Sequence, residues 1–251
     1  MRQKTALITG ASRGLGRDMA INLAKQGINI IFSYHSNKSK ANEVVREIEA
    51  LGQTATAFQF NANYYNGGQD FINEATQYLQ NKCNDSNFDF LINNAGTGTY
   101  NLVEDTSEVQ FDEMMNVHLK SVYFLTQAAL PYINEGGRII NISSGLARFS
   151  LPGMSAYAMM KGGVEVFTRY LAKELGSRKI TANVVAPGAI ATDFAGDSNK
   201  DKEKSALISS VTALGRVGQA EDIGGVVAFL CSEKAGWING QRIEVSGGML
   251  V

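Results

Sequence analysis

A short apolar run followed at once by a glycine-rich turn most constrains how this chain folds. Residues 5–9 have the length and composition of a buried strand. Glycines follow at positions 10, 14 and 16, and a helical pattern then places Leu15, Met19 and Leu23 on one face. Glycines let backbone N–H groups approach a diphosphate, and a helix N-terminus supplies partial positive charge there. Because glycines also occur in ordinary loops, the turn alone is only a candidate nucleotide site. The rest of the chain must show whether it binds a nucleotide.

Strand and helix patterns alternate along the whole chain. Further strands are predicted at residues 28–32, 54–59, 88–92, 138–142, 180–185 and 242–245. After the first helix, which Gly27 ends, helices are predicted at residues 39–51, 70–82, 107–130, 156–175 and 221–231. The alternation predicts an α/β fold with a parallel sheet covered on both faces. We see no linker, repeat or low-complexity tract, so residues 1–251 are expected to form a single domain.

The composition narrows the partners and the compartment. The formal net charge of -1 argues against nucleic acid or an anionic membrane as the main partner, since both require a basic surface. Cys83 and Cys231 lie far apart, so we expect free thiols of a reducing compartment and no metal site. No segment has the length of a signal peptide or a transmembrane helix. We therefore expect a cytoplasmic protein.

Chemistry-bearing side chains gather in the second half of the chain. The strand at 138–142 delivers Ser143 and Ser144 at its carboxyl end, where ligands bind in open parallel sheets. Tyr157 and Lys161 are four residues apart on one face of the next helix. A lysine ammonium favours the phenolate of a nearby tyrosine, and a serine hydroxyl can bind a substrate carbonyl. These are the parts needed for proton transfer coupled to hydride transfer, although an isolated Tyr-x-x-x-Lys is usually a surface pair.

The combination of motifs resembles the short-chain dehydrogenase/reductase family, and the resemblance covers essentially the whole chain. In the family's order, the matching motifs are Thr9-Gly10-x-x-x-Gly14-x-Gly16, Asn93-Asn94-Ala95-Gly96, Ser144, Tyr157-x-x-x-Lys161 and Pro187-Gly188 with Thr192. The resemblance implies a Rossmann fold, with a doubly wound seven-stranded parallel sheet that binds NAD(P). It also implies an assembly that is commonly a homotetramer.

The resemblance assigns roles to individual residues. Tyr157 is expected to donate a proton to the carbonyl in reduction, or to act as the base in oxidation. Lys161 is expected to lower the tyrosine pKa and hold the nicotinamide ribose, and Ser144, not Ser143, takes the family's serine position. Asn94 is expected to be structural. The expected cofactor-binding residues are Gly10, Ser12, Arg13, Gly14, Leu15, Gly16, His35, Ser36, Asn61, Ala62, Asn93, Ala95, Gly96, Tyr157, Lys161, Pro187, Gly188, Ile190 and Thr192.

The chain departs from the family pattern in three places. His118 stands where the family has a catalytic asparagine that helps hold a kink in the long helix. A neutral histidine can make the same hydrogen bond, and its unperturbed pKa of about 6.5 would also permit a proton relay. Packing alone is the competing interpretation. Asn61-Ala62 replaces the usual Asp-Val, and residues 63–68 have no evident explanation.

The end of the second strand bears on the cofactor. NAD-specific members place a carboxylate there for the ribose 2′-OH, whereas this chain has Tyr34 followed by residues 35–38 without an acid. Arg13 adds a cation suited to a 2′-phosphate, unless it only caps a surface loop. We therefore predict a preference for NADP(H), with NAD(H) possible.

The first functional hypothesis is an NADPH-dependent reductase of a ketone or aldehyde, similar to 3-oxoacyl-carrier-protein reductases, whose substrate is a small-molecule or acyl-thioester carbonyl. A dehydrogenase oxidising a sugar, polyol or other secondary alcohol is the alternative. A non-catalytic dinucleotide sensor is the hypothesis from another class, which turnover of NADPH with a ketone would exclude.

The substrate pocket is expected between residues 146–154 and 194–210, where Arg148 faces either an acid or solvent. The expected homotetramer would bury apolar residues of 163–175 and 237–251, namely Val164, Phe167, Leu171, Met249 and Leu250.

Overall fold

The computed structural model describes residues 3–64, 66–192 and 201–251 and contains one seven-stranded sheet in the order β3-β2-β1-β4-β5-β6-β7. Every neighbouring pair of strands is parallel. This confirms the predicted doubly wound α/β fold. The strands are β1 (Thr5–Ile8), β2 (Asn29–Tyr34), β3 (Ala55–Gln59), β4 (Phe88–Asn93), β5 (Ile133–Ile142), β6 (Thr181–Pro187) and β7 (Arg242–Val245).

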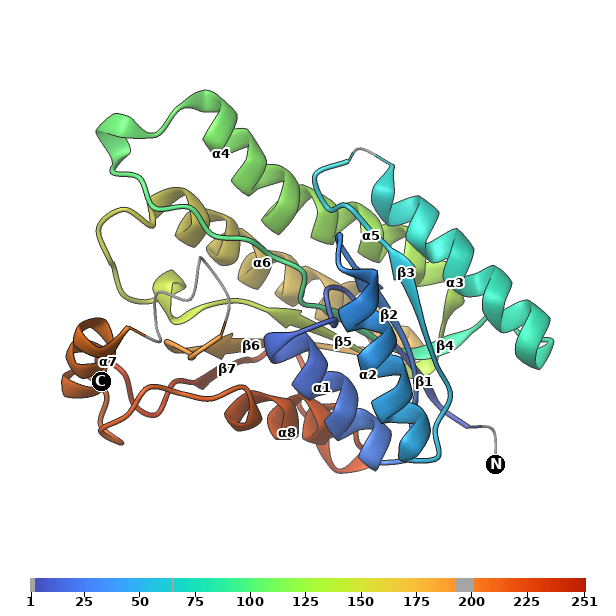
Figure 1. The fold of residues 1–251 in the computed structure, drawn as a ribbon. Coiled ribbons are helices and arrows are strands. Elements are labelled where there is room, and N and C mark those ends of the chain that lie inside the picture. Colours follow the sequence, from blue (N-terminus) through green and yellow to red (C-terminus); the bar gives the residue numbers. More distant parts are fainter. Residues whose placement is uncertain (1–2, 65, 193–200) are drawn as a thin grey trace.

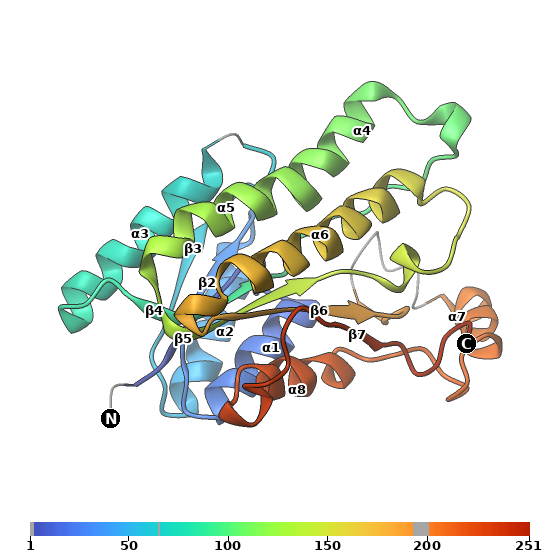
Figure 2. The same cartoon turned by 180° about the vertical axis from the view of Figure 1, so that it is seen from behind.

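Helices cover both faces of the sheet (Figures 1 and 2). On one face lie α1 (Gly14–Lys25), α2 (Lys38–Ala50) and α8 (Glu221–Leu230), and on the other lie α3 (Gly67–Cys83), α4 (Glu108–Met115), α5 (Ser121–Ala129) and α6 (Ser155–Glu174). Side chains alternate between two cores, so that Leu7 and Ile31 pack toward α3 and α5, while Ile8 and Phe32 pack toward α1 and α2. This two-sided burial explains why the strands are continuously apolar.

The order of the strands reverses at β1, whose neighbours are β2 and β4. Ligands of open parallel sheets bind beside such a reversal, outside the carboxyl ends of the strands. In Figure 1 this edge lies on the side of α7 (Lys202–Ser210) and the C-terminus, opposite the N-terminus. The fold therefore places the glycine turn and the loops after β4, β5 and β6 at one edge.

Three elements differ from the prediction. The helix expected at 107–130 is interrupted by a π-helical turn, Asn116–Lys120, between α4 and α5. Strand β5 begins at Ile133 and not at the predicted position 138, so it includes Gly136 and Gly137; its register with β4 shifts between Phe88 and Phe90. Helix α7 lies in the stretch where no helix was predicted, with the Asp201 side chain accepting hydrogen bonds from two backbone N–H groups at its start.

Residues 66–68 lead into α3, and the structure gives a reason for both glycines. A Cβ on Gly67 would lie 2.6 Å from the carbonyl oxygen of Asn61, and one on Gly68 would lie 3.0 Å from Cβ of Leu125. The glycines therefore let the start of α3 closely approach α5 and the chain just after β3. These contacts explain the two glycines of the unusual stretch.

Two expectations about individual residues can be compared with the structure directly. Cys83 and Cys231 are free thiols, as predicted, the first exposed and the second buried. Val164 and Leu171, predicted to be exposed for an interface, are instead buried in the core, because α6 turns these positions toward the sheet. Within the described part of the chain, no helix is long and apolar enough to cross a membrane.

Candidate active site

The glycine turn between β1 and α1 has the backbone that the sequence predicted. Gly10 and Gly14 have φ of 70° and 55°, which is left-handed backbone that favours glycine. A Cβ on Gly16 would lie 2.3 Å from the carbonyl oxygen of Gly10, so this position also requires glycine. The first turn of α1 carries no acidic residue. The turn is therefore a cradle that fits a diphosphate at a helix N-terminus.

The loop after β6 faces this cradle. A cleft of about 190 Å³ is lined by Gly14, Arg17 and Asp18 on one side and by Ala191, Thr192 and residues 219–221 on the other. The backbone of Gly188 passes so close to Ser246 that a Cβ would lie 2.9 Å from its Cα, and Ile190 is buried. The structure thus brings the predicted Pro187–Thr192 segment against the glycine turn. Ser12, Arg13 and Leu15 belong to the same turn.

The end of β2 carries no carboxylate. Tyr34 is buried, whereas His35 and Ser36 are exposed, and the Asn37 side chain caps α2 by accepting a hydrogen bond from Lys40 N at 3.0 Å. The first turn of α2 has no acidic residue. No carboxylate at this helix start would therefore repel an anionic group.

The motif after β4 divides into structural and site-facing parts. The Asn93 amide is buried and donates to Asn141 Oδ1 at 2.8 Å and to Thr126 Oγ1 at 3.0 Å, so its side chain is structural. Asn94 Nδ2 donates to the carbonyl oxygens of Thr9 and Gly10 at 2.9 and 3.0 Å. Asn94 therefore fixes the glycine turn, in agreement with the structural role predicted for it.

Four other predicted cofactor residues, Asn61, Ala62, Ala95 and Gly96, follow the ends of β3 and β4. The Asn61 side chain, at the position where the family has an acidic residue, accepts a hydrogen bond from Asn63 N at 3.0 Å and so forms a local turn. Ala62 packs against the core. Ala95 N donates to Thr9 Oγ1 at 2.9 Å, and the Gly96 backbone passes the His118 ring, where a Cβ would lie 2.8 Å from Cε1.

Ser144, Tyr157 and Lys161 meet at the carboxyl end of β5. The Ser144 hydroxyl hydrogen-bonds the Tyr157 phenol and accepts a hydrogen bond from Leu146 N at 3.2 Å. Lys161 Nζ donates to the carbonyl oxygen of Ile142 at 2.8 Å and lies 5.6 Å from the centroid of the Tyr157 ring. Tyr157 and Lys161 are both buried. The three predicted catalytic side chains therefore form one cluster.

The ionisation of this cluster differs from the expectation. Burial raises the pKa of Tyr157 to about 12, and only the hydrogen bond with Ser144 opposes this rise. Burial lowers the pKa of Lys161 to about 8. Desolvation therefore dominates the pKa of Tyr157 in this structure, and the lowering expected from Lys161 stays a prediction. At neutral pH Tyr157 is a neutral phenol that can donate a proton.

His118 lies in the π-helical turn and is buried against the cluster. Its ring packs edge-on against Tyr157, with centroids 4.9 Å apart, and its Nε2 lies 2.7 Å from the carbonyl oxygen of Thr97. At that distance Nε2–H donates, which leaves the buried Nδ1 with no hydrogen-bond partner among the described residues. Burial, aided by the charge of Lys161, lowers the pKa of His118 to about 3. His118 therefore stays neutral near pH 7, which removes the ionisation that a charge-switching relay would need.

The predicted substrate wall is partly described. Leu146 and Met154 pack against a small apolar cluster that contains Tyr157, Met114 and Met160. Arg148, for which an acid or solvent was expected as the partner, pairs with Glu244 of the same chain. Its Nη2 donates to Glu244 Oε1 at 2.7 Å. Phe194 and the other residues of 193–200 lie outside the described residues. In the described part of the chain, no group of three or more His, Cys, Asp or Glu side chains is placed to hold a metal ion.

One signal near the site escaped the sequence analysis. Glu165 follows Lys161 by four residues, as Lys161 follows Tyr157, so α6 carries all three on one face. Its carboxylate accepts a hydrogen bond from Ser143 at 2.7 Å and pairs with Arg242 Nε at 2.7 Å.

Comparisons with known proteins find related reductases over nearly the whole chain. A family model described as enoyl-(acyl carrier protein) reductase matches residues 10–250. The 3-oxoacyl-[acyl-carrier-protein] reductase FabG of Staphylococcus aureus is 40% identical over 248 residues, covering 98% of each chain. The promiscuous reductase LugOII, which catalyses keto-reduction at C1 during lugdunomycin biosynthesis, has a TM-score of 0.93 at 37% identity, covering 99% of this chain and 98% of its own. The angucycline C-6 ketoreductase LanV with bound NADP has a TM-score of 0.94 at 37% identity, covering 98% of this chain and 95% of its own.

Proposed function

Because the chain belongs to the short-chain dehydrogenase/reductase family, we propose that it is an NADPH-dependent reductase of a ketone or aldehyde. The observation that carries the proposal is the buried cluster in which a neutral Tyr157 hydrogen-bonds Ser144 beside Lys161. The substrate class is a 3-oxoacyl-thioester-like or small-molecule carbonyl, since the relatives include an oxoacyl reductase and two ketoreductases.

Each residue of the cluster has a step in this reaction. NADPH, when bound, supplies the hydride to the carbonyl carbon. Ser144 and Tyr157 bind the carbonyl oxygen, and the Tyr157 phenol gives its proton to that oxygen as negative charge develops there. The Lys161 ammonium then stabilises the phenolate. The raised pKa of Tyr157 suits this direction, since the residue holds the proton to be donated at neutral pH.

The residues near the end of β2 support NADPH as the preferred cofactor. The start of α2 carries no acid in its first turn, and Tyr34 stands where a carboxylate would select NAD. Arg13, at the N-cap of α1, supplies a cation for the 2′-phosphate. The glycine cradle and the loop at 187–192 would hold the diphosphate and the nicotinamide, and Lys161 the nicotinamide ribose. NAD(H) remains a weaker substitute.

His118 is proposed to replace the family's asparagine as a structural group. It joins the π-helical turn to Thr97 in the loop after β4 and supports one side of the Tyr157 ring. A neutral ring performs both tasks, so no change of its charge enters the reaction.

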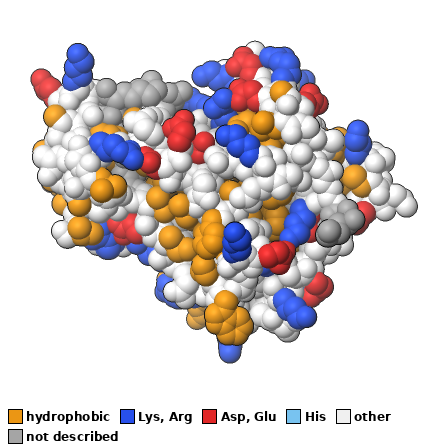
Figure 3. Space-filling model, turned by 90° about the horizontal axis from the view of Figure 1, so that it is seen from below, with side chains coloured by type: hydrophobic (Ala, Val, Ile, Leu, Met, Phe, Trp, Pro, Cys, Tyr) orange, Lys and Arg blue, Asp and Glu red, His pale blue; other side chains and the backbone are white. Residues whose placement is uncertain are grey.

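A homotetramer is proposed on different residues from those first expected. Tyr123 and Phe124 on α5 and Val166 and Tyr170 on α6 are exposed. On the face covered by α1, α2 and α8, Figure 3 shows hydrophobic side chains gathered between charged ones. Two apolar areas on different faces suit an assembly with two interfaces. Light scattering that gives one subunit mass at micromolar concentration would contradict it.

The free thiols fit a reducing, cytoplasmic compartment.

Oxidation of NADPH in the presence of different carbonyl compounds tests the proposed function. The panel contains a 3-oxoacyl thioester, a polycyclic ketone and an aldehyde, each assayed with NADPH and with NADH. An enoyl thioester and a polyol with NADP⁺ are the opposing substrates. We expect kcat/KM to be highest for a carbonyl compound with NADPH. Faster turnover of the enoyl thioester or the polyol, or no turnover at all, would refute the proposal.

A further inference from the structure

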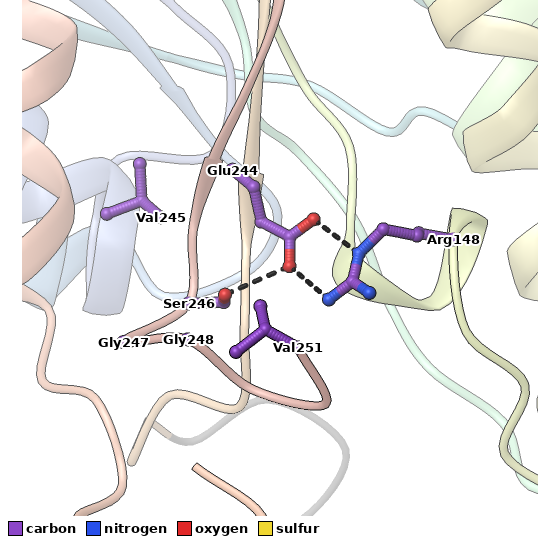
Figure 4. A pocket seen from close by; sticks show the side chains of 7 residues that line it. All are labelled: Arg148, Glu244, Val245, Ser246, Gly247, Gly248 and Val251. Atoms are coloured by element: carbon purple, nitrogen blue, oxygen red, sulfur yellow. Dashed lines mark hydrogen bonds and ion pairs between the residues drawn. The ribbon is translucent and has the colours of Figure 1, made fainter. Parts of the chain in front are cut away.

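Four charged side chains form an alternating chain beside the catalytic serine. Arg148 pairs with Glu244, Glu244 with Arg242, and Arg242 with Glu165, through hydrogen bonds of 2.7 to 2.8 Å. We call these four residues the serine brace. Figure 4 shows its outer end, where Arg148 and Glu244 are hydrogen-bonded to each other and line a cavity of about 550 Å³ together with the C-terminal turn.

The inner end of the brace holds the start of the loop that carries Ser144. Arg242 Nη2 donates to the carbonyl oxygen of Ser144 at 3.2 Å, and Glu165 accepts the hydroxyl hydrogen bond of Ser143. The two contacts come from β7 and from α6, on different sides of the loop. Because α6 also carries Tyr157, Glu165 ties the serine loop to the helix of its catalytic partner.

The outer end of the brace holds the middle of the same loop. Arg148 follows the short 3₁₀ turn Gly145–Ala147 and is joined to Glu244 by two parallel hydrogen bonds. Its guanidinium also donates to the carbonyl oxygens of Met249 and Leu250 at 2.7 and 3.0 Å. One connected set of charges therefore fixes the loop between β5 and α6 at its start and at its middle.

The position of these charges argues for a role beyond stability. The side chains of Glu165, Glu244 and Arg242 are only 13%, 19% and 23% exposed. Ion pairs withdrawn from water in this way gain little net stability over apolar packing, and their best-attested benefit is a fixed geometry. A planar guanidinium with three separate hydrogen bonds fixes direction as well as distance.

We propose that the serine brace positions Ser144 for catalysis, with Arg242 as its central positioning residue. The proposal rests on the proposed carbonyl reduction by Ser144 and Tyr157. None of the four residues has to touch the substrate. Arg242 acts through the carbonyl of Ser144 and through Glu165, so that the Ser144 hydroxyl keeps its hydrogen bond with Tyr157.

A double-mutant cycle between Arg242 and Ser144 tests the proposal. Arg242→Met and Arg242→Lys are each made alone and together with Ser144→Ala, and kcat and the KM for NADPH are measured. Misplacing a catalytic group by about 1 Å can cost ~100-fold in rate, so we expect kcat to fall between about 10- and 100-fold in Arg242→Met. The KM for NADPH should change by less than about threefold, because the brace lies away from the glycine cradle. Arg242→Lys keeps the charge without the fork and should rescue only part of kcat.

The non-additivity of the cycle separates positioning from general destabilisation. If Arg242 acts through Ser144, Arg242→Met should lower kcat little further once Ser144 is alanine. Arg178→Met is the matched control, since Arg178 pairs with Glu135 and donates to the carbonyl oxygen of Leu130 at the opposite end of β5. It should leave kcat unchanged.

Two results would overturn the inference: a kcat within twofold of wild type in Arg242→Met, or losses in Arg242→Met and Ser144→Ala that multiply fully. If Arg242→Met does not fold, the cycle is run with Arg242→Lys and Glu165→Gln, which keep the volume of the site, under the same criteria. Absence of carbonyl reduction by the wild-type protein would instead refute the proposed function.

Discussion

Asn94 joins two parts of the cofactor site, and its replacement gives a prediction with a defined magnitude. Its amide donates to the carbonyl oxygens of Thr9 and Gly10. Each such hydrogen bond contributes about 1 kcal/mol, so Asn94→Ala should lower the free energy of unfolding by about 2 kcal/mol. Asn94→Asp should lower it further, because a carboxylate would then face two carbonyl oxygens without a proton to donate.

Urea unfolding and NADPH titration together check this prediction. Asn134→Ala is the matched control, since Asn134 Nδ2 donates to Phe88 O at 3.0 Å and to Asp89 Oδ1 at 3.2 Å, away from the glycine turn. Both alanine variants should lose similar stability, but only Asn94→Ala should bind NADPH more weakly. Asn94→Asp as stable as Asn94→Ala, or equal NADPH affinity in the two alanine variants, would refute the reasoning.

Two further predictions follow from ionisation. His118→Asn should retain activity and leave the pH–rate profile between pH 6 and 7 unchanged, because the pKa of His118 lies at about 3. His118→Ala should lower kcat, because it removes the contact with Thr97. A changed profile in His118→Asn would contradict the neutral role. Hydrogen bonds from Arg148, and also from Arg242 and Ser246, lower the pKa of Glu244 from 4.5 to about 2. Since the pKa is lower in the folded state, the stabilisation is present above pH 4.5 and is lost as pH falls toward 2, by at most about 3 kcal/mol. The stability difference between wild type and Glu244→Gln should therefore shrink over that range in urea unfolding, and a constant difference would contradict it.

The apolar patterns of the sequence predicted the fold well, because burial of the sheet on both faces produces these patterns. All seven strands overlap the apolar runs that predicted them, and strand β7 has the predicted bounds, whereas β5 begins earlier. The π-helical turn at 116–120 was missed because it inserts into a continuous helical pattern without changing the residue types. Helix α7 was missed because its residues are mostly polar and its periodicity is weak.

The parts of the site that were missed depend on contacts between distant residues. Glu165 and Arg242 are 77 positions apart, and Arg148 and Glu244 are 96 apart, so no local pattern could pair them. The effect of burial on the pKa of Tyr157 was missed for a related reason. The four-residue spacing placed Lys161 nearby, but the burial that dominates the phenol appears only when the helix packs on the sheet.

The rate of NADPH oxidation by Tyr157→Phe, compared with wild type on the best carbonyl substrate, tests the central claim most directly. The change keeps the ring against His118 but removes the proton that we propose Tyr157 donates. We predict a fall in kcat of ~100- to 10,000-fold, as is typical for a lost acid–base group, with NADPH binding preserved. A near-normal rate in Tyr157→Phe would contradict the account of this site.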